Sequence, residues 1–171
     1  TPDYTFPSTA CFLQNRLGMK QGFAFDVNAV CSGFIYALDV ADSMITAGRA
    51  QNLLVVGVDI YSHIINPQDR TTCVLFGDGA GAIVLSSTTS LNGGDAARSV
   101  NGARGMSGSV DAVRGLIASE LHADGSQAAI LCVPNGSAKP MTPERLANGE
   151  HLLTMAGREV FKLAVRGLSE V

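Results

Sequence analysis

The stretch FDVNAVCSGFIYAL, residues 25–38, contains the change of pattern that decides the fold. An extended apolar run ends at Cys31, and a helical pattern begins directly after it. A thiol between the end of a buried strand and the first turn of a helix lies among unpaired backbone N–H groups, at the positive end of the helix dipole. Both features favour the thiolate over the thiol. The position predicts a nucleophile, although a buried junction of this kind can also hold an inert thiol.

The segments on either side of Cys31 predict a βαβ unit. We expect a mostly buried strand over residues 22–30, then a helix buried on several sides that ends at Gly48. The uninterrupted apolar run at residues 53–58 predicts a strand covered on both faces, as in a parallel or mixed sheet. Upstream, Ser8 is expected to cap a short helix over residues 9–17.

A glycine-rich run, GDGAG at residues 77–81, follows a polar loop. We expect strands at 73–76 and 80–86, either paired or joined as one kinked strand. The glycines can be fitted to a dinucleotide-binding fingerprint, but that fingerprint needs a helix after it, and a strand pattern follows here. We therefore favour close backbone packing for these glycines.

The second half of the chain predicts a mixture of strands, loops and one helix. The sequence favours a hairpin of strands at 116–121 and 128–133, a loop at 139–151, and an amphipathic helix from residue 155 to 171. The Gly, Ser, Ala and Asn content of 88–114 indicates a flexible surface insertion. We therefore expect α/β architecture in three parts: residues 1–87, 88–114 and 115–171.

Composition excludes several classes of protein. With 171 residues, 46% hydrophobic and 16% charged, the chain has enough apolar material for one domain-sized core and no run long enough to cross a membrane. Its 12 Lys and Arg against 15 Asp and Glu, without a basic cluster, give no reason to propose nucleic acid or a membrane as partner. No cofactor is expected.

The 4 cysteines form no CxxC pair and have no metal-like spacing with the histidines, so we expect neither a metal site nor a disulfide framework. Cys11, Cys73 and Cys132 lie in apolar runs, where a free cysteine usually acts as a small buried hydrophobe. We expect a reduced, cytoplasmic protein. Because the sequence starts at Thr1 and stops within a helical pattern, we also expect a piece of a longer protein.

Several motifs along the chain strongly resemble β-ketoacyl-acyl-carrier-protein synthase III, in the same order and nearly the same wording. They are DVNAVCSGF at 26–34, DRTT at 69–72, FGDGAGA at 76–82, LHADG at 121–125 and MAGREVF at 155–161. The resemblance implies the thiolase-like fold, in which two similar α/β halves form five layers. It implies that residues 1–87 belong to the first half and 115–171 to the start of the second.

The resemblance also implies a reaction. A short acyl group would pass from acyl-coenzyme A to Cys31 and then be condensed with malonyl-acyl carrier protein, in a homodimer. The residues support the first step best, because a thiolate exchanges acyl groups between thioesters and the Cys31 amide can help to hold the oxyanion. The second step uses a His and an Asn that lie beyond the segment matching Val171 in the family. His63, His122 and His151 match none of the family's catalytic His contexts.

Other positions match substrate-contacting residues of the family. Arg70 matches the arginine that stacks near the adenine of coenzyme A, and the alternative is a loop arginine paired with Asp69. Phe6 matches the residue that crosses the dimer interface to close the partner's acyl pocket. Arg158 falls where some members carry Asn near the pantetheine, so its role is open. The remaining matches are tunnel-wall positions that ordinary core packing explains equally well: Phe76, Leu131, Met155 and Phe161.

Three functions remain open: a priming condensing enzyme, a related acyltransferase of secondary metabolism, and a non-catalytic remnant or assembly partner. Asp26 and Asp78 each adjoin a turn or helix start, where a carboxylate commonly satisfies backbone N–H groups, so neither is assigned to catalysis. We expect the whole protein to be an active synthase and the 171-residue chain alone to be unable to decarboxylate malonyl groups.

Overall fold

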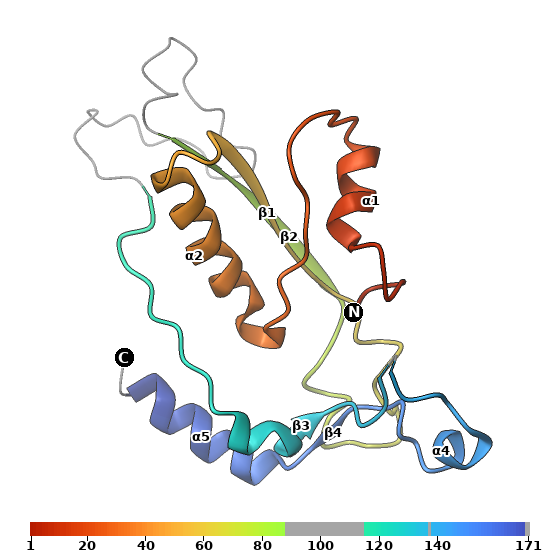
Figure 1. Ribbon diagram of the computed structural model, residues 1–171. Coiled ribbons are helices and arrows are strands. Elements are labelled where there is room, and N and C mark those ends of the chain that lie inside the picture. Colours follow the sequence, from red (N-terminus) through yellow and green to blue (C-terminus); the bar gives the residue numbers. More distant parts are fainter. Residues whose placement is uncertain (88–114, 137, 170–171) are drawn as a thin grey trace. The chain divides into compact units, whose positions relative to one another are not determined.

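The computed structural model describes residues 1–87, 115–136 and 138–169 (Figure 1). These residues form two compact units. One takes residues 1–25, 58–79 and 122–169, and the other takes 26–57 and 80–121 with the undescribed stretch left out. The expected insertion at 88–114 lies outside the described residues. Each unit draws on both flanks of that stretch, and the predicted division into 1–87 and 115–171 stays a prediction.

The unit that contains Cys31 is built from a helix and a pair of strands (Figure 1). Its elements are η1 (Val30–Ser32), α2 (Gly33–Thr46), β1 (Asn52–Asp59) and β2 (Gly79–Ser86). Helix α2 ends where the sequence predicted, because Gly48 adopts a φ of +68° that continues the chain out of the helix. Strands β1 and β2 confirm the expected strands at 53–58 and 80–86.

Strands β1 and β2 form a two-stranded sheet of their own. The Ser87 amide donates to the Gln51 carbonyl at 2.8 Å, which joins the end of β2 to the start of β1 and makes the pair antiparallel. Burial alternates along β1: Val55 is only 6% exposed, while its neighbours Leu54 and Val56 are 41% and 37% exposed. One face of β1 is therefore covered in the described structure. Ala41 of α2 is also buried, with 4% exposure.

The other unit begins with α1 (Thr9–Arg16), whose start and end are both set by local signals. The Ser8 hydroxyl accepts a hydrogen bond from the Cys11 amide at 3.4 Å, and Gly18 takes a φ of +68° just after the helix. The predicted cap and helix are confirmed.

The remaining elements of this unit are η2 (Gly125–Ile130), β3 (Leu131–Cys132), α4 (Pro143–Ala147), β4 (Thr154–Met155) and α5 (Gly157–Ser169). Strands β3 and β4 pair antiparallel, with Leu131 opposite Met155. The Leu153 amide donates to the Ile64 carbonyl at 2.7 Å, and the Leu153 side chain is only 6% exposed. Leu153 therefore belongs to the buried core of this unit. Helix α5 confirms the predicted C-terminal helix.

The predicted βαβ unit is wrong in the described structure. Residues 23–29 have no strand assignment, Val30 already belongs to η1, and β1 pairs antiparallel with β2 instead of parallel to this segment. An apolar run favours extended backbone, but a strand also needs a hydrogen-bonded neighbour, which these residues lack within the described ranges. The two-sided cover expected for β1 and the all-round burial expected for α2 are also not seen, since Ile35 is 49% exposed.

Local hydrogen bonds explain most of the other errors. Residues 73–75 form turns and Phe76 has no strand assignment, because the Thr72 and Cys73 amides donate to the Asp69 carbonyl at 3.2 and 3.0 Å. The expected hairpin of 116–121 and 128–133 is absent: the first segment has no strand assignment, and the second is split between η2, which ends at Ile130, and the short strand β3. Asp124 caps η2 through the Ser126 amide, and this capping outweighs the β propensity of the residues that follow.

The predicted loop at 139–151 contains helix α4. The Thr142 hydroxyl accepts from the Arg145 amide at 3.2 Å, and Pro143 occupies the first turn, where it costs no hydrogen bond. The Thr-Pro-Glu sequence at 142–144 is an N-terminal helix signal that was missed because the helix is short.

Candidate active site

Cys31 is the middle residue of the short 3₁₀ helix η1, which leads directly into α2. The described structure leaves its side chain exposed, so the predicted nucleophile is accessible. It lies at the start of a helix of 14 residues, where backbone N–H groups have no partners within the helix and the helix dipole is positive. The predicted position of Cys31 at the extended-to-helix junction is confirmed, with an unpaired extended segment in place of the expected strand.

The backbone around Cys31 has an unusual conformation. Val30 has a φ of +47°, in the left-handed region that β-branched residues rarely adopt. The Ser32 amide donates to the Ala29 carbonyl at 3.1 Å and closes the turn. Within the described ranges, the Cys31 amide has no hydrogen-bond acceptor. The turn therefore exposes a thiol and a free N–H on the same residue, a combination that can bind a carbonyl oxygen while sulfur attacks the carbon.

Helix α2 is fixed against β1 by one close contact. A Cβ atom on Gly57 would lie 3.0 Å from Cδ2 of Phe34, so the absence of a side chain on Gly57 allows the Phe34 ring to lie directly on the strand. The Ser119 hydroxyl donates to the Asp39 carboxylate and attaches the extended segment 115–121 to the same helix. These contacts hold the helix whose first turn follows Cys31.

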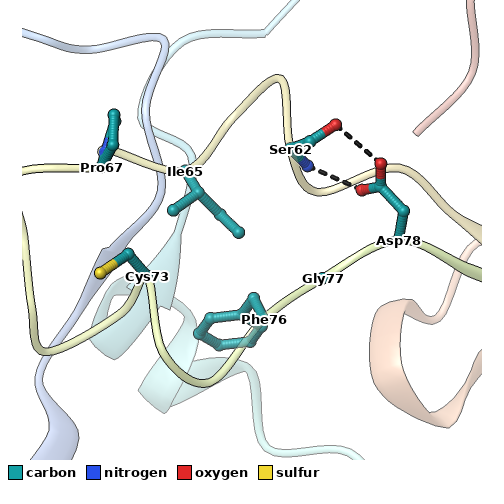
Figure 2. Close-up of a pocket in the computed structure, with 7 residues that line it drawn as sticks. All are labelled: Ser62, Ile65, Pro67, Cys73, Phe76, Gly77 and Asp78. Carbon is teal, nitrogen blue, oxygen red and sulfur yellow. Dashed lines mark hydrogen bonds between the residues drawn. The ribbon is translucent and has the colours of Figure 1, made fainter.

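A pocket of about 370 Å³ lies in the other unit, in the loop between β1 and β2 (Figure 2). Phe76, one of the predicted tunnel-wall residues, lines it, and Ile65 points toward its middle (Figure 2). The ring of Tyr61 stacks on Phe76 with centroids 5.2 Å apart. Tyr61 and Ile65 were not predicted from the sequence. The signal available for Tyr61 was an aromatic residue shortly after the end of β1 at Asp59.

The Ser62 and Asp78 pair closes one end of this pocket (Figure 2). Both the amide and the hydroxyl of Ser62 donate to the Asp78 carboxylate at 2.8 Å, and these bonds lower the pKa of Asp78, with a smaller contribution from His63. Asp78 therefore satisfies a backbone N–H group, as predicted, and stays charged. A pocket with apolar walls and one anionic end suits a neutral acyl chain better than an anionic group.

Arg70 lies on the turn between Asp69 and Thr72 and is exposed. Asp69 is occupied by other donors: its Oδ1 accepts from the amide and hydroxyl of Thr71 at 2.9 and 2.6 Å, and its Oδ2 accepts from the Thr72 hydroxyl at 2.7 Å. These bonds lower the pKa of the Asp69 carboxyl, led by the Thr71 hydroxyl. Within the described ranges no ion pair joins Arg70 to Asp69, so the alternative reading of Arg70 is not supported.

The remaining predicted residues of this unit differ in exposure. Leu131 and Met155 face each other across β3 and β4, and both are half-buried. Phe161 and Arg158, on α5, are exposed, and Phe161 is 70% exposed, so core packing does not account for it within the described structure. Phe6 is an accessible aromatic residue in a loop: its side chain is 80% exposed, and a cis peptide bond joins it to Pro7.

The structure thus brings some predicted residues together. Leu131 pairs with Met155, and Phe76 lines the pocket. Cys31 belongs to one compact unit, and the other predicted site residues belong to the other. The three remaining cysteines, Cys11, Cys73 and Cys132, are half-buried, so the full burial expected for them is not seen in the described structure.

The described residues contain neither a metal-binding cluster nor a membrane-spanning helix. No group of three or more His, Cys, Asp and Glu side chains in the described ranges is arranged to hold a metal ion. No helix among the elements described above has the length and apolar character needed to cross a membrane.

Comparison with known proteins gives a consistent result. The sequence model of the family described as 3-oxoacyl-[acyl-carrier-protein (ACP)] synthase III matches residues 25–105. A curated β-ketoacyl-[acyl-carrier-protein] synthase III from Paramagnetospirillum magneticum is 46% identical over all 171 residues, which cover 45% of that relative. The chain therefore spans slightly less than half the length of the curated relative it matches.

Solved structures agree with the sequence match. The 3-oxoacyl-[acyl-carrier-protein] synthase III of Aquifex aeolicus is 40% identical, with a TM-score of 0.72 over 100% of this chain and 44% of that one. The synthase III of Thermus thermophilus is 39% identical, with a TM-score of 0.69 over 97% of this chain and 44% of that one.

These matches show that the chain shares part of the thiolase-like α/β fold of these condensing enzymes. Within that class, the chain is similar to the 3-oxoacyl-[acyl-carrier-protein] synthase III family, through the model match at residues 25–105 and the 46% identity to the curated relative. The match at residues 25–105 includes both the Cys31 turn and the Arg70 turn.

Proposed function

We propose that this chain is the nucleophile-bearing part of a β-ketoacyl-acyl-carrier-protein synthase III that starts fatty-acid synthesis. The observation that carries the proposal is the Cys31 turn: an exposed thiol with its own unpartnered amide, at the start of a 14-residue helix, in a sequence of this family. Short acyl-coenzyme A and malonyl-acyl carrier protein are the proposed substrates, and no cofactor takes part.

In the first half-reaction the Cys31 thiolate attacks the thioester carbonyl of acyl-coenzyme A. The carbon–sulfur bond to coenzyme A breaks, coenzyme A leaves as a thiolate that takes up a proton, and an acyl thioester forms on Cys31. The Cys31 amide is the donor available to the oxyanion, and Arg70 is the proposed contact for the nucleotide end of coenzyme A. Phe76, Leu131, Met155 and Phe161 are proposed walls for the acyl and pantetheine parts, and Arg158 a neighbour of the pantetheine.

In the second half-reaction malonyl-acyl carrier protein loses carbon dioxide, and the resulting carbanion attacks the acyl carbonyl on Cys31. The carbon–sulfur bond to Cys31 breaks, which releases 3-oxoacyl-carrier protein and regenerates the Cys31 thiolate. This step needs neutral hydrogen-bond donors at the malonyl carbonyl, and His63, His122 and His151 do not supply the family's pattern. The proposal assigns that step to a longer protein, working as a cytoplasmic homodimer in which Phe6 of one subunit closes the acyl pocket of the other. The 80% exposure of Phe6 supports an intermolecular role.

The test is acylation of the purified 171-residue chain by acetyl-coenzyme A, followed by intact-protein mass spectrometry and peptide mapping. We expect one acetyl group, on Cys31. Cys31→Ala should remove it, and Cys132→Ala, which deletes a half-buried thiol elsewhere, should leave it unchanged. Absence of any acetylation would favour the non-catalytic alternative and overturn the proposal.

Two further measurements separate the halves of the reaction. The chain alone should release no carbon dioxide from malonyl-carrier protein, and release would contradict our assignment of that step to a longer protein. A hybrid in which residues 1–171 replace the matching segment of the Paramagnetospirillum relative should carry out both steps. A hybrid that is acylated but never forms 3-oxoacyl-carrier protein would favour an acyltransferase without elongation.

A further inference from the structure

The turn that carries Arg70 has a buried hydrogen-bonded centre. Thr72 is 0% exposed, the only buried polar side chain among the described residues, and its hydroxyl donates to Asp69 Oδ2 at 2.7 Å. Burial of a hydroxyl is costly unless it is hydrogen-bonded, and this bond supplies the partner. Thr72 and Asp69 therefore stabilise each other's position.

Asp69 is the acceptor around which the turn folds. Its carboxylate receives the amide and hydroxyl of Thr71 and the hydroxyl of Thr72, while its carbonyl receives the amides of Thr72 and Cys73. Its own amide donates to the Asn66 carbonyl at 3.0 Å. The backbone on both sides of Arg70 is thereby fixed by bonds that do not involve the Arg70 side chain.

The same bonds also occupy the Asp69 carboxylate, which would otherwise compete with a ligand for the Arg70 guanidinium. A carboxylate one residue away is the obvious ion-pair partner for a loop arginine, yet both oxygens of Asp69 are already hydrogen-bonded to Thr71 and Thr72. The exposed guanidinium has no partner within the described ranges and keeps its donors for a ligand with phosphate oxygens or an aromatic ring.

We propose that Asp69 and Thr72 are positioning residues for acyl-coenzyme A binding, which hold the Arg70 turn in place and keep the Asp69 carboxylate away from the guanidinium. This inference rests on the proposed function and adds residues that act through Arg70. In Thr72→Val the Asp69 Oδ2 loses its hydroxyl donor, becomes available to Arg70, and draws the guanidinium away from the nucleotide of the donor.

The test compares two acyl donors on the full 171-residue chain: acetyl-coenzyme A and S-acetyl-N-acetylcysteamine, a thioester that lacks the nucleotide. The rate constant for acetylation of Cys31 is measured by intact mass. Thr72→Val and Arg70→Ala should each lower the rate with acetyl-coenzyme A about tenfold at subsaturating donor, equivalent to the loss of one charge-assisted contact. Neither should change the rate with the short thioester.

Controls separate positioning from general damage. Thr72→Ser keeps the hydroxyl and should retain the parent rate with both donors. The double variant Thr72→Val/Arg70→Ala should be no slower than Arg70→Ala alone, because the two changes remove the same contact.

The outcomes distinguish the two proposals. A chain that is acetylated by neither donor overturns the proposed function itself. If the parent chain reacts normally but Thr72→Val slows both donors equally, or slows neither, the positioning role is wrong. Additive effects in the double variant would also overturn it, because Thr72 would then act independently of Arg70.

Discussion

The Cys31 turn and the Arg70 turn hold their key residues by different means. At Cys31 the position comes from backbone conformation: Val30 adopts a φ of +47°, and no side-chain hydrogen bond caps η1 or α2. At Arg70 the position comes from side chains, because Asp69, Thr71 and Thr72 close the turn through hydrogen bonds. The first arrangement leaves the amide of the reactive residue free, whereas the second leaves a cationic side chain free.

This difference suits the chemistry proposed for each turn. A nucleophile that must also donate its amide to an oxyanion cannot have that amide consumed by a cap, so a strained backbone conformation takes the place of a side-chain cap there. A binding residue needs only its side chain, so the surrounding backbone can be fully hydrogen-bonded. Each prediction below tests one side of this comparison.

The largest effect is expected at Cys31. Cys31→Ala should reduce acetylation of the chain to the background of the other thiols, because it removes the attacking sulfur. Intact-protein mass spectrometry after incubation with acetyl-coenzyme A measures this. Retained acetylation at a different cysteine of the variant would contradict the assignment of the nucleophile.

The second effect concerns the support under α2. Gly57→Ala should lower the free energy of unfolding by about 1–3 kcal/mol, because the new Cβ would lie 3.0 Å from Phe34 and force the ring to move. Urea denaturation followed by circular dichroism measures the change. Gly81→Ala on β2, where nothing lies within 4 Å of the added carbon, is the matched control and should be close to neutral.

A smaller effect on stability is expected at Val30, the residue with a strained backbone conformation that precedes Cys31. Val30→Gly should raise the free energy of unfolding by up to about 1 kcal/mol, because relief of the left-handed conformation exceeds the entropy cost of glycine. Val74→Gly is the control: Val74 and Val30 are 71% and 68% exposed, but only Val30 has a positive φ. Val74→Gly should be destabilising, and equal destabilisation of both variants would argue against strain at Val30.

The smallest effect is a titration. Hydrogen bonds from Thr71 and Thr72 lower the pKa of Asp69 below its usual 3.8, so the stabilisation they give is present above that pH and is lost as the pH falls through the lowered pKa. Thr72→Val should move the Asp69 pKa upward, toward 3.8, as measured by carbon NMR of the labelled carboxyl group. An unchanged titration would show that the Thr72 hydroxyl is not a significant donor to the carboxylate.

Much of the helical structure could be predicted from local signals. Ser8 and Gly18 bracket α1, Gly48 follows α2, and the periodic apolar residues of 157–169 gave α5. Helices are predictable in this way because their hydrogen bonds and caps join residues close in sequence. Helix α4 was missed even though Thr142 and Pro143 signal its start, because a helix of 5 residues carries no periodic pattern.

The strands were predicted less well. Residues 53–58 and 80–86 were identified from composition, but the partner of β1 and the direction of pairing were not. Residues 22–30 and 116–121 have apolar, extended sequences without a ladder in the described structure. Strand pairing joins distant residues, so a composition that permits extension does not decide whether a neighbour is present.

The candidate site shows the same division. Cys31 could be predicted because its position depends on the local change from extended to helical pattern, whereas the Tyr61–Phe76 stack depends on residues 15 positions apart being brought together. For Arg70 the sequence alone left open whether Asp69 would pair with it. The described structure answers that question through the Thr71 and Thr72 hydroxyls.

By itself the sequence predicted the family resemblance, the limits of the longer helices and the residue that carries the thiol. Those properties depend on side-chain order and on hydrogen bonds between residues a few positions apart. Only the tertiary structure decided which strands pair, that β1 has an exposed face, and that Thr72 is buried against Asp69. The physical reason is that the burial of a side chain, and the donor that a given acceptor binds, depend on which distant residues the fold brings into contact. Several arrangements of one sequence satisfy its local preferences equally well.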